Sequence, residues 1–329
     1  MNGYFLISLD YELIWGVNDK KSVNSYGANL RAVTNVVKQT LQMFSKFDIH
    51  ASWATVGILL QEDIEDFKAS FPEVLPEYDN SRLSSYNYFK NEIDNIGFNQ
   101  NSDSCHWAFY SVKEILNSPN QELASHTYSH YYTLEPGQTI EAFESDTKAF
   151  SIKAKQFGLD IASIVFPRNQ INPEYFKICL KYGLKCYRGV EQSYLWKPRN
   201  GSDLRLWIRL LRFVDAYISI SGNNCYKMPS KNSGILLNFP SSAFLRAYNP
   251  KLSIFDSLKL FRIKRAMSYA AKTGTIYHLW WHPHNFGKHT ASNFSFLEKI
   301  LLHYDKLNHK YGFESLNMKE LTNKVINRK

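Results

Sequence analysis

The sequence has few cysteines and lacks any long apolar run. Four cysteines occur in 329 residues, at Cys105, Cys179, Cys186 and Cys225, and no two have the close spacing of a structural zinc site. No apolar run reaches the ~18 residues that a transmembrane helix needs. An apolar strand is predicted almost at Met1, so no secretory leader is expected. We therefore expect free thiols and a location in the reducing cytoplasm.

Linkers and low-complexity segments are also missing. Hydrophobic residues make up 44% of the chain, aromatic residues 15% and charged residues 21%, which is the composition of a globular protein with a large core. We expect a single domain over residues 1–329. The stretch 61–107 is too long for a simple connection, and we expect it to form a helical insertion over the functional site. A second insertion, basic and amphipathic, is expected at 185–260.

The sequence lacks the signatures of nucleic-acid binding, although its formal net charge is +9 and its pI is about 9.1. No helix-turn-helix or zinc-finger spacing occurs, and basic and aromatic residues are not interleaved as in a recognition module. The charge is also uneven, because residues 61–150 contain 16 acidic and 5 basic residues. The positive charge therefore lies elsewhere in the chain. We expect no nucleic-acid partner.

Positive charge is concentrated in the second half of the chain. Residues 204–214 predict an amphipathic helix with Arg205, Arg209 and Arg212 on one face and a broad apolar face opposite. One interpretation is an outer helix packed on the core. The other is a helix seated at an anionic membrane surface, which would give peripheral contact with a membrane. A second basic cluster, 246–272, could equally bind the pyrophosphate of a substrate.

Two polar clusters carry the functional signal. Asp10 and Glu12 follow the predicted strand 4–9, so their carboxylates share one face. His126 and His130 also share a face if they begin a helical turn. Two imidazoles and a carboxylate suit zinc. Each cluster alone has an ordinary explanation, since a carboxylate pair can be solvated and an i,i+4 histidine pair arises by chance in roughly a quarter of chains with this many histidines.

The order of the predicted elements strengthens this interpretation. Helices are expected at 30–47 and 140–157, and strands at 51–57, 161–168 and 274–282. Strands and helices alternate, which indicates an α/β protein. Reactive side chains follow the ends of several strands, where β/α barrels carry their chemistry.

These segments resemble the motifs of the polysaccharide deacetylase family, carbohydrate esterase family four. Residues 8–12 look like its first motif, 51–57 like its second strand and 125–130 like its metal-binding motif. Residues 166–170 occupy the place of the arginine motif, and 280–284 that of the final motif. The resemblance spans most of the chain. It implies a distorted (β/α) barrel of about seven strands with helical insertions.

The resemblance also implies a metal site. It makes Glu12, His126 and His130 the metal ligands and Asp10 the general base. Many members have two adjacent aspartates, the base and a ligand, whereas Tyr11 follows the first aspartate here, so Glu12 takes the place of the second. The implied cofactor is a divalent ion, zinc first and cobalt, nickel or manganese as alternatives. Such an ion lowers the pKa of a bound water and polarises an amide carbonyl.

Further roles follow from the same resemblance. Arg168 would hold the base ionised through a charge-assisted hydrogen bond. Asn169 stands near it in place of the usual continuation of the motif, and is a candidate substrate contact. His282 would protonate the departing amine. His284 and His278 are alternatives for this acid role. His278 and His282 share one face of an extended strand.

The expected function is that of a metal-dependent carbohydrate deacetylase, which hydrolyses the linear amide of an N-acetylated amino sugar. The expected context is assembly or modification of a cell-surface glycan such as lipopolysaccharide or O-antigen, in the cytoplasm or at the inner face of the membrane. The sugar would be nucleotide-linked, lipid-linked or polymeric. One alternative is a non-catalytic barrel that binds a sugar or lipid at a degenerate site. Another is a glycosidase using Asp10 and Glu12, which would leave Arg168 without a function.

Overall fold

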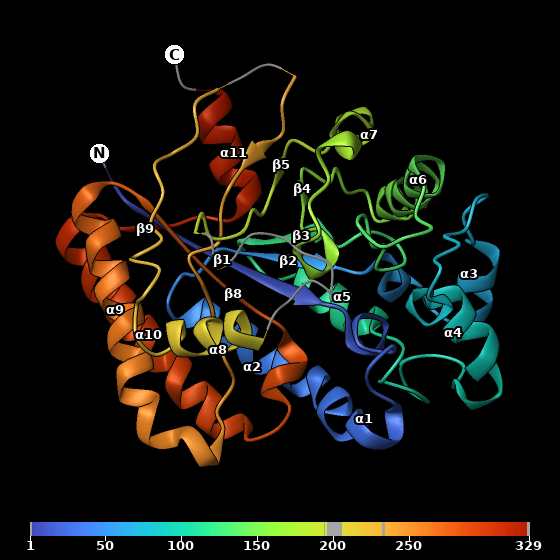
Figure 1. Cartoon of the computed structure of the whole chain (residues 1–329), viewed down its shortest axis with the longest axis horizontal. Helices are drawn as coiled ribbons and strands as arrows, with labels where there is room; N and C mark the ends of the chain where they lie inside the picture. The colour runs from blue at the N-terminus through green and yellow to red at the C-terminus, as the bar shows by residue number, and fades with distance from the viewer. Residues whose placement is uncertain (1, 194, 196–205, 232–233, 328–329) are drawn as a thin grey trace.

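A curled parallel β-sheet surrounded by helices forms the molecule (Figure 1). The computed structural model describes residues 2–193, 195, 206–231 and 234–327. The strands are β1 Tyr4–Tyr11, β2 Ala51–Thr55, β3 Gln121–Ser125, β4 Ser163–Ile164, β5 Cys186–Tyr187, β6 Leu237–Asn238, β7 Ala243–Phe244, β8 Ile276–Trp281 and β9 Glu314–Ser315.

The sheet curls into a barrel because its two outer strands belong to one segment. The strand order is β6-β5-β4-β3-β2-β1-β8-β7, every pair is parallel, and β9 pairs with the start of β1. Phe239, which follows β6, donates its backbone N–H to the carbonyl of Tyr187 in β5, and Ser242 donates its backbone N–H to the carbonyl of His278 in β8. Residues 237–244 therefore hydrogen-bond first to β5 at one edge of the sheet and then to β8 at the other edge. Counted as one bent strand, they give seven barrel strands, as the sequence predicts.

Helices cover the outside of this barrel in Figure 1. Among the described residues, none is long and apolar enough to cross a membrane. The predicted helix 30–47 is divided at Ala32 into α1 and α2. The α-helices are α1 Val23–Arg31, α2 Val33–Lys46, α3 Ile64–Ala69, α4 Ser85–Glu92, α5 Phe109–Leu116, α6 Ile140–Gln156, α7 Phe176–Lys181, α8 Leu206–Asp215, α9 Asp256–Thr273, α10 Thr290–Tyr311 and α11 Met318–Ile326.

Strand β1 shows how the barrel positions polar groups. All eight of its residues are buried, because helices cover one side and the barrel interior the other. Phe5, Ile7 and Leu9 belong to the main apolar core together with residues of the outer helices. The alternate residues Ser8 and Asp10 point to the other face, as the period of two requires. Polar side chains near the C-terminal end of β1 therefore gather inside the barrel.

Candidate metal and catalytic site

The loop that follows β3 carries both histidines of the metal-binding motif. His126 directly follows the strand and donates its backbone N–H to Thr55 of β2. Thr127 and His130 have left-handed backbone conformations, with φ values of 60° and 59°. The prediction of a helical turn at 126–130 is therefore wrong, and a loop with two left-handed residues brings the imidazoles to the same side.

A buried carboxylate of α6 stabilises this loop. Asp146 accepts hydrogen bonds from the backbone N–H groups of Tyr128, at 2.6 Å, and Ser129, at 2.9 Å, and from the Ser129 hydroxyl. The first turn of a helix also leaves its N–H groups without partners inside the helix, and here a side chain 17 or 18 residues away accepts from them. This long-range contact explains why the local spacing of the histidines gave the wrong backbone conformation.

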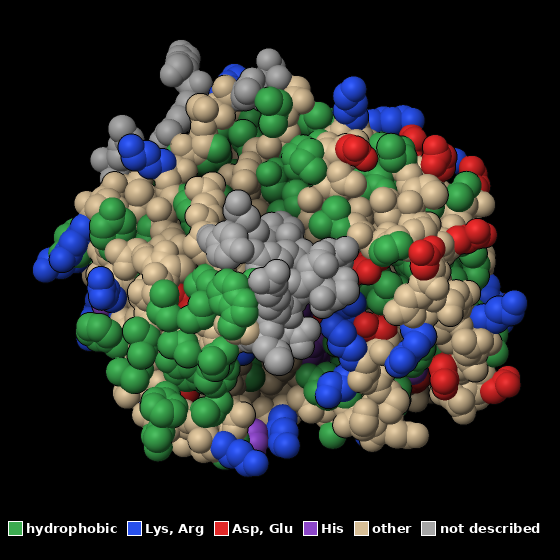
Figure 2. Space-filling model, in the orientation of Figure 1, with side chains coloured by type: hydrophobic (Ala, Val, Ile, Leu, Met, Phe, Trp, Pro, Cys, Tyr) green, Lys and Arg blue, Asp and Glu red, His purple; other side chains and the backbone are tan. Residues whose placement is uncertain are grey.

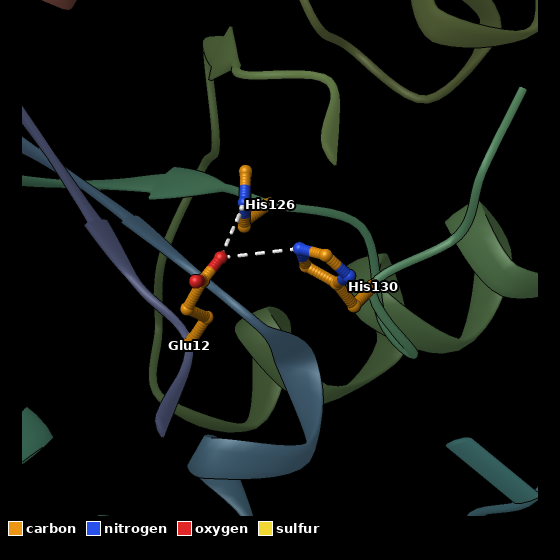
Figure 3. Close-up of side chains that lie close together, drawn as sticks. All are labelled: Glu12, His126 and His130. Carbon is orange, nitrogen blue, oxygen red and sulfur yellow. Dashed lines mark hydrogen bonds and ion pairs between the residues drawn. The ribbon is translucent and has the colours of Figure 1, made fainter. Parts of the chain in front are cut away.

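Glu12, His126 and His130 lie together at the C-terminal ends of β1 and β3 (Figure 3). Oε2 of Glu12 is 3.1 Å from Nε2 of His130 and 3.4 Å from Nε2 of His126. All three side chains are buried, and their candidate ligand atoms lie within 4.8 Å of one another. The structure thus brings together the three residues that the sequence suggested as ligands, and metal binding itself remains a prediction.

The hydrogen bonds around these side chains suit a metal site. Nδ1 of His126 is 2.8 Å from the Val165 carbonyl and donates to it, so Nε2 presents a lone pair. That Nε2 atom is buried and has no hydrogen-bond partner within the described parts of the chain. Nδ1 of His130 is 3.1 Å from the Tyr132 hydroxyl. Outer hydrogen bonds of this kind orient metal-binding imidazoles.

Charges in the site also fit a divalent ion. Burial lowers the pKa of His130 to about 4 against the opposing effect of Glu12, so the imidazole is neutral at neutral pH. Burial alone would raise the pKa of Glu12, but His282 and the adjacent imidazoles of His126 and His130 bring it well below its usual value. An anionic carboxylate and two neutral imidazoles form a common zinc-binding set. The donor atoms do not distinguish zinc from cobalt, nickel or manganese.

Gly16 leaves the space that the Glu12 carboxylate occupies. It ends the 3-10 helix Leu13–Gly16, and a Cβ at this position would overlap the carboxyl carbon and both carboxylate oxygens of Glu12. A side chain at position 16 would therefore displace the ligand. The sequence analysis did not identify Gly16 as part of the site, because sequence spacing alone does not show what a glycine faces.

We expect Gly16→Ala to weaken zinc binding by about 10- to 100-fold, the effect typical of disturbing a group that positions a ligand. Competition with a chelating dye measures the affinity, and the thermal midpoint of the metal-free protein shows whether the fold is kept. Gly27→Ala is the matched control, because the three atoms nearest to its Cβ would belong to the guanidinium of Arg31, the movable end of a long side chain. Unchanged affinity in the Gly16→Ala protein would show that the carboxylate of Glu12 does not bind the ion.

Asp10 is paired with Arg188, which the sequence analysis did not identify. Nη1 and Nη2 of this arginine donate to Oδ1 and Oδ2 of Asp10 at 2.6 and 2.8 Å. Arg188 is 1% exposed and lies over the Trp280 ring at 4.0 Å. Nη2 also donates to Oδ1 of Asn169 at 3.1 Å, so this asparagine orients the arginine. Arg188 follows β5, whose two residues are too few to reveal a strand by alternation.

The prediction that Arg168 holds the carboxylate of Asp10 is wrong. Nη2 of Arg168 bonds Asp19 at 2.6 Å instead, and the guanidinium lies 4.6 Å from the centre of the Tyr132 ring. The left-handed backbone of Arg168, with φ 53°, directs the side chain to this different partner. Arg168 contacts Tyr132, and Tyr132 in turn contacts His130, so Arg168 is linked to the candidate metal ligands through the tyrosine.

The charge state of Asp10 follows from this pairing. Burial alone would raise its pKa, but Arg188 opposes burial through its charge and its hydrogen bonds, with His126 and His282 nearby. The net result is a pKa below the usual value. Asp10 is therefore ionised at neutral pH, as a general base must be.

His278 supports this pair from inside the barrel. Its Nδ1 is 3.1 Å from the Phe239 carbonyl, and its Nε2 is 2.8 Å from the Ser8 hydroxyl, which also accepts from Arg188 at 3.1 Å. Burial lowers the pKa of His278 to about 3, so the ring is neutral. Because both ring nitrogens have partners within the protein, neither faces a substrate. The structure gives His278 a supporting position.

His282 and His284 follow β8 and stack with their ring centres 5.1 Å apart. Nε2 of His282 lies 3.7 Å from Oδ2 of Asp10 and 3.6 Å from Oε1 of Glu12, and its side chain is 23% exposed. Nδ1 of His284 lies 3.9 Å from Oε1 of Glu12, and burial lowers the pKa of this histidine to about 4. His282 is thus the member of the pair that a substrate can reach.

The segment 61–107 packs against the histidine loop. Gln61 donates to the Tyr128 hydroxyl at 2.9 Å, and Ser85 donates to the Ser129 carbonyl at 2.7 Å. The segment contains α3, α4 and the 3-10 helices at 81–83 and 93–95, which agrees with its predicted helical character. These contacts buttress the loop, and a position over the site stays a prediction.

Comparison with known proteins relates the chain to others by fold. No family model matches the sequence, and no curated protein matches it. A "putative polysaccharide deacetylase" from Mycobacterium smegmatis superposes with a TM-score of 0.58 at 10% identity, covering 99% of this chain and 91% of that one. A GH57-type branching enzyme from Pyrococcus horikoshii gives 0.54 at 11%, covering 98% and 70%. The α-amylase AmyC from Thermotoga maritima gives 0.52 at 9%, covering 98% and 75%.

At these identities the similarity concerns the fold. The parallel order of the strands and the helices around them are those of a (β/α) barrel of the deacetylase type. The same architecture carries glycoside-active enzymes, so the choice of reaction depends on the residues of the site.

Proposed function

We propose that this protein is a metal-dependent hydrolase that removes the N-acetyl group of an amino sugar. The observation that carries the proposal is the buried group of Glu12, His126 and His130 at the end of the barrel that also holds Asp10 and His282. Together they provide a metal site, a carboxylate base and an accessible imidazole. The fold similarity to a deacetylase agrees with this chemistry but does not establish it.

Asp10 would take the proton of the attacking water. A divalent ion held by the Glu12 group would supply an acidic water and a polarised carbonyl. Arg188 keeps Asp10 ionised and fixes both carboxylate oxygens by two hydrogen bonds, so the base has one orientation. Arg188 and Asp10 are buried, which limits the water that would otherwise screen their interaction.

His282 would donate a proton to the departing amine. An amine is a poor leaving group until it is protonated, and general acid catalysis of this step contributes typically 10²- to 10⁴-fold. The ring lies near the carboxylates of Asp10 and Glu12, and it is partly exposed. Its position after β8 places it across the site from the histidine loop after β3.

The proposed substrate is an N-acetylated sugar joined to a carrier, either a nucleotide or a lipid. The basic segment 246–272 supports an anionic carrier, since a pyrophosphate would be attracted to it. We place the reaction in assembly or modification of a cell-surface glycan such as lipopolysaccharide or O-antigen, at the cytoplasmic face of a membrane. Only the basic segments and the cysteine pattern support that placement.

The proposal is tested by acetate release. Protein loaded with zinc is incubated with free, nucleotide-linked and lipid-linked N-acetylated sugars, beside chelated protein and the His126→Ala variant. We expect release from one class of donor, loss on chelation, restoration by added zinc, and no release by His126→Ala. Release that survives both chelation and the substitution would contradict the metal-dependent mechanism.

A non-catalytic barrel that binds sugars or lipid is the alternative proposal. It predicts stoichiometric zinc and sugar binding without acetate release from any donor. A glycosidase that uses Asp10 and Glu12 predicts release of reducing sugar instead of acetate. Measuring acetate and reducing sugar in the same incubation distinguishes the deacetylase, the non-catalytic barrel and the glycosidase.

A further inference from the structure

Large apolar side chains are exposed together on α8 and around the start of α9. Figure 2 shows a broad hydrophobic area at the lower left, over the position of these helices in Figure 1. We call this surface the apolar rim. Its residues, with their exposed fractions, are Trp207 at 45%, Leu210 at 62%, Ile254 at 77%, Phe255 at 41%, Leu258 at 44% and Phe261 at 66%.

The side chains of the apolar rim point away from the core of the protein. Ile254 lies in the 3-10 helix Pro250–Phe255 that leads into α9, and Leu258 and Phe261 follow on the outer side of α9. Ile263 and Met267 of α9 are buried on its inner side. The helix therefore has an apolar inner face, which packs on the barrel, and a second apolar face in its first turns. Soluble monomers rarely expose large contiguous apolar patches without a binding function.

Helix α8 joins the same surface. Ile208 is buried while Trp207 and Leu210 are exposed, so α8 keeps one apolar face inward and another outward. The Tyr217 ring after α8 lies 6.0 Å from the ring of Phe255. Of the helix predicted at 204–214, residues 204 and 205 and the side chains at 206 and 209 lie outside the described residues.

The apolar rim lies on the same side of the barrel as the candidate site. Helix α9 follows β7 and therefore starts at the C-terminal ends of the strands, where Asp10 lies. Phe244 of β7 contacts the His282 ring, with 5.6 Å between centres. Arg246, two residues later, lies 5.5 Å from the ring of Phe213 on α8. A short stretch of chain thus connects the proposed proton donor to the rim.

Positive charge accompanies the apolar rim. Residues 246–272 contain seven basic residues and one acidic residue. The acidic residue, Asp256, lies 2.8 Å from Lys259 and is neutralised by it. Arg262 is paired with Asp215 at 3.1 Å, whereas Lys251 before α9 and Arg265 and Lys272 on α9 are exposed. The basic residues are Arg246, Lys251, Lys259, Arg262, Lys264, Arg265 and Lys272.

We propose that the apolar rim docks on the surface of an anionic lipid bilayer. Apolar side chains would enter the headgroup region while the surrounding lysines and arginines bind acidic lipid headgroups, as interfacial helices do. A second copy of the chain is a poorer partner, because a twofold contact would bring the two basic segments face to face. An anionic bilayer complements both the apolar area and the charge.

Docking would place the candidate site at the membrane surface and would select a lipid-linked sugar over a nucleotide-linked one. This choice of substrate rests on the proposed function, whereas docking itself does not. The two can be tested separately, since docking is measured with vesicles that contain no substrate, and hydrolysis is measured with a detergent-solubilised donor in the absence of vesicles.

The test is flotation of the full chain with vesicles of phosphatidylcholine, with or without phosphatidylglycerol. We expect binding to the vesicles that contain phosphatidylglycerol, weakened by salt. Replacing Ile254 and Phe261 by aspartate should lower the partition coefficient by about tenfold or more, since two large apolar side chains no longer enter the bilayer. The matched control replaces Ile152 and Leu302 by aspartate, because they are exposed by 51% and 46% on other helices.

Each other outcome would overturn the proposal. Absence of flotation with either vesicle, or equal losses in the rim and control variants, would exclude specific docking. Sedimentation at rising concentration tests the second copy as partner: a dimer that dissociates in the rim variant, without vesicle binding by either protein, would assign the rim to self-association. The circular dichroism spectrum and the thermal midpoint of the rim variant, compared with those of the wild type, show whether its barrel remains intact.

Discussion

Replacing Asp10 by asparagine should lower acetate release by about 10²- to 10⁴-fold, the contribution of a positioned general base. Asparagine has nearly the same shape but cannot accept a proton from water. It can still accept a hydrogen bond from Arg188 through its amide oxygen, so the side chain should keep its place. Because Asp10 is not among the candidate metal ligands, zinc affinity should change little.

The measurement is the single-turnover rate of Asp10→Asn at saturating zinc, with bound zinc counted in the same sample. Asp19→Asn is the matched control, because Asp19 is a buried carboxylate that pairs with an arginine, Arg168, outside the proposed chemistry. A rate for Asp10→Asn within a few fold of the wild type would assign the base to another group. Loss of zinc with loss of rate would instead make Asp10 a ligand.

Arg188→Met should destabilise the metal-free protein by about 3–5 kcal/mol, the cost of leaving one partner of a buried ion pair alone. Without the arginine, burial of Asp10 is less strongly opposed, and its pKa should rise from the lowered value it has now. In the wild type, this lowered pKa contributes stability above the unfolded pKa of about 3.9, and that stability is lost as pH falls through the folded pKa. The loss in the variant should therefore be larger at neutral pH than near pH 4.

Urea unfolding at both pH values measures this difference. The double variant Asp10→Asn with Arg188→Met should recover part of the stability, because no carboxylate is then left without its partner. Arg168→Met is the matched control: its guanidinium is more exposed, with a side chain at 25% against 0% for Arg188, so a smaller loss is expected. Equal losses in the two arginine variants, independent of pH, would contradict the assignment of Arg188 as the partner that fixes the charge of Asp10.

The sequence allowed the candidate metal ligands to be predicted because they follow long strands. Glu12 comes directly after the eight-residue β1, and His126 directly after the five-residue β3, so strand pattern and motif agreed. Arg188 was missed because β5 has only two residues, and Arg168 took its place in the prediction. A motif shows which arginine is near a strand end, but the backbone conformation decides where its side chain points.

Long-range contacts explain the other differences. Local spacing predicted a helical turn for the histidine loop, but Asp146 satisfies the backbone of Tyr128 and Ser129 from another helix. Gly16 gave no signal, because its importance depends on the position of the Glu12 carboxylate. The barrel with about seven strands was predicted, although the bent segment 237–244 that completes it has too few consecutive strand residues to be recognised.

The ion pair of Asp10 and Arg188 spans the interior of the barrel, since one partner comes from β1 and the other follows β5, with three strands between them in the sheet order. The orientation of the proposed base and the stability of the barrel therefore depend on the same two side chains. A lineage that lost the reaction by changing the aspartate would leave an arginine charge buried, and would have to replace both residues together to remain folded. Changing either residue alone would thus cost stability, whereas changing both together would not leave a buried charge without a partner.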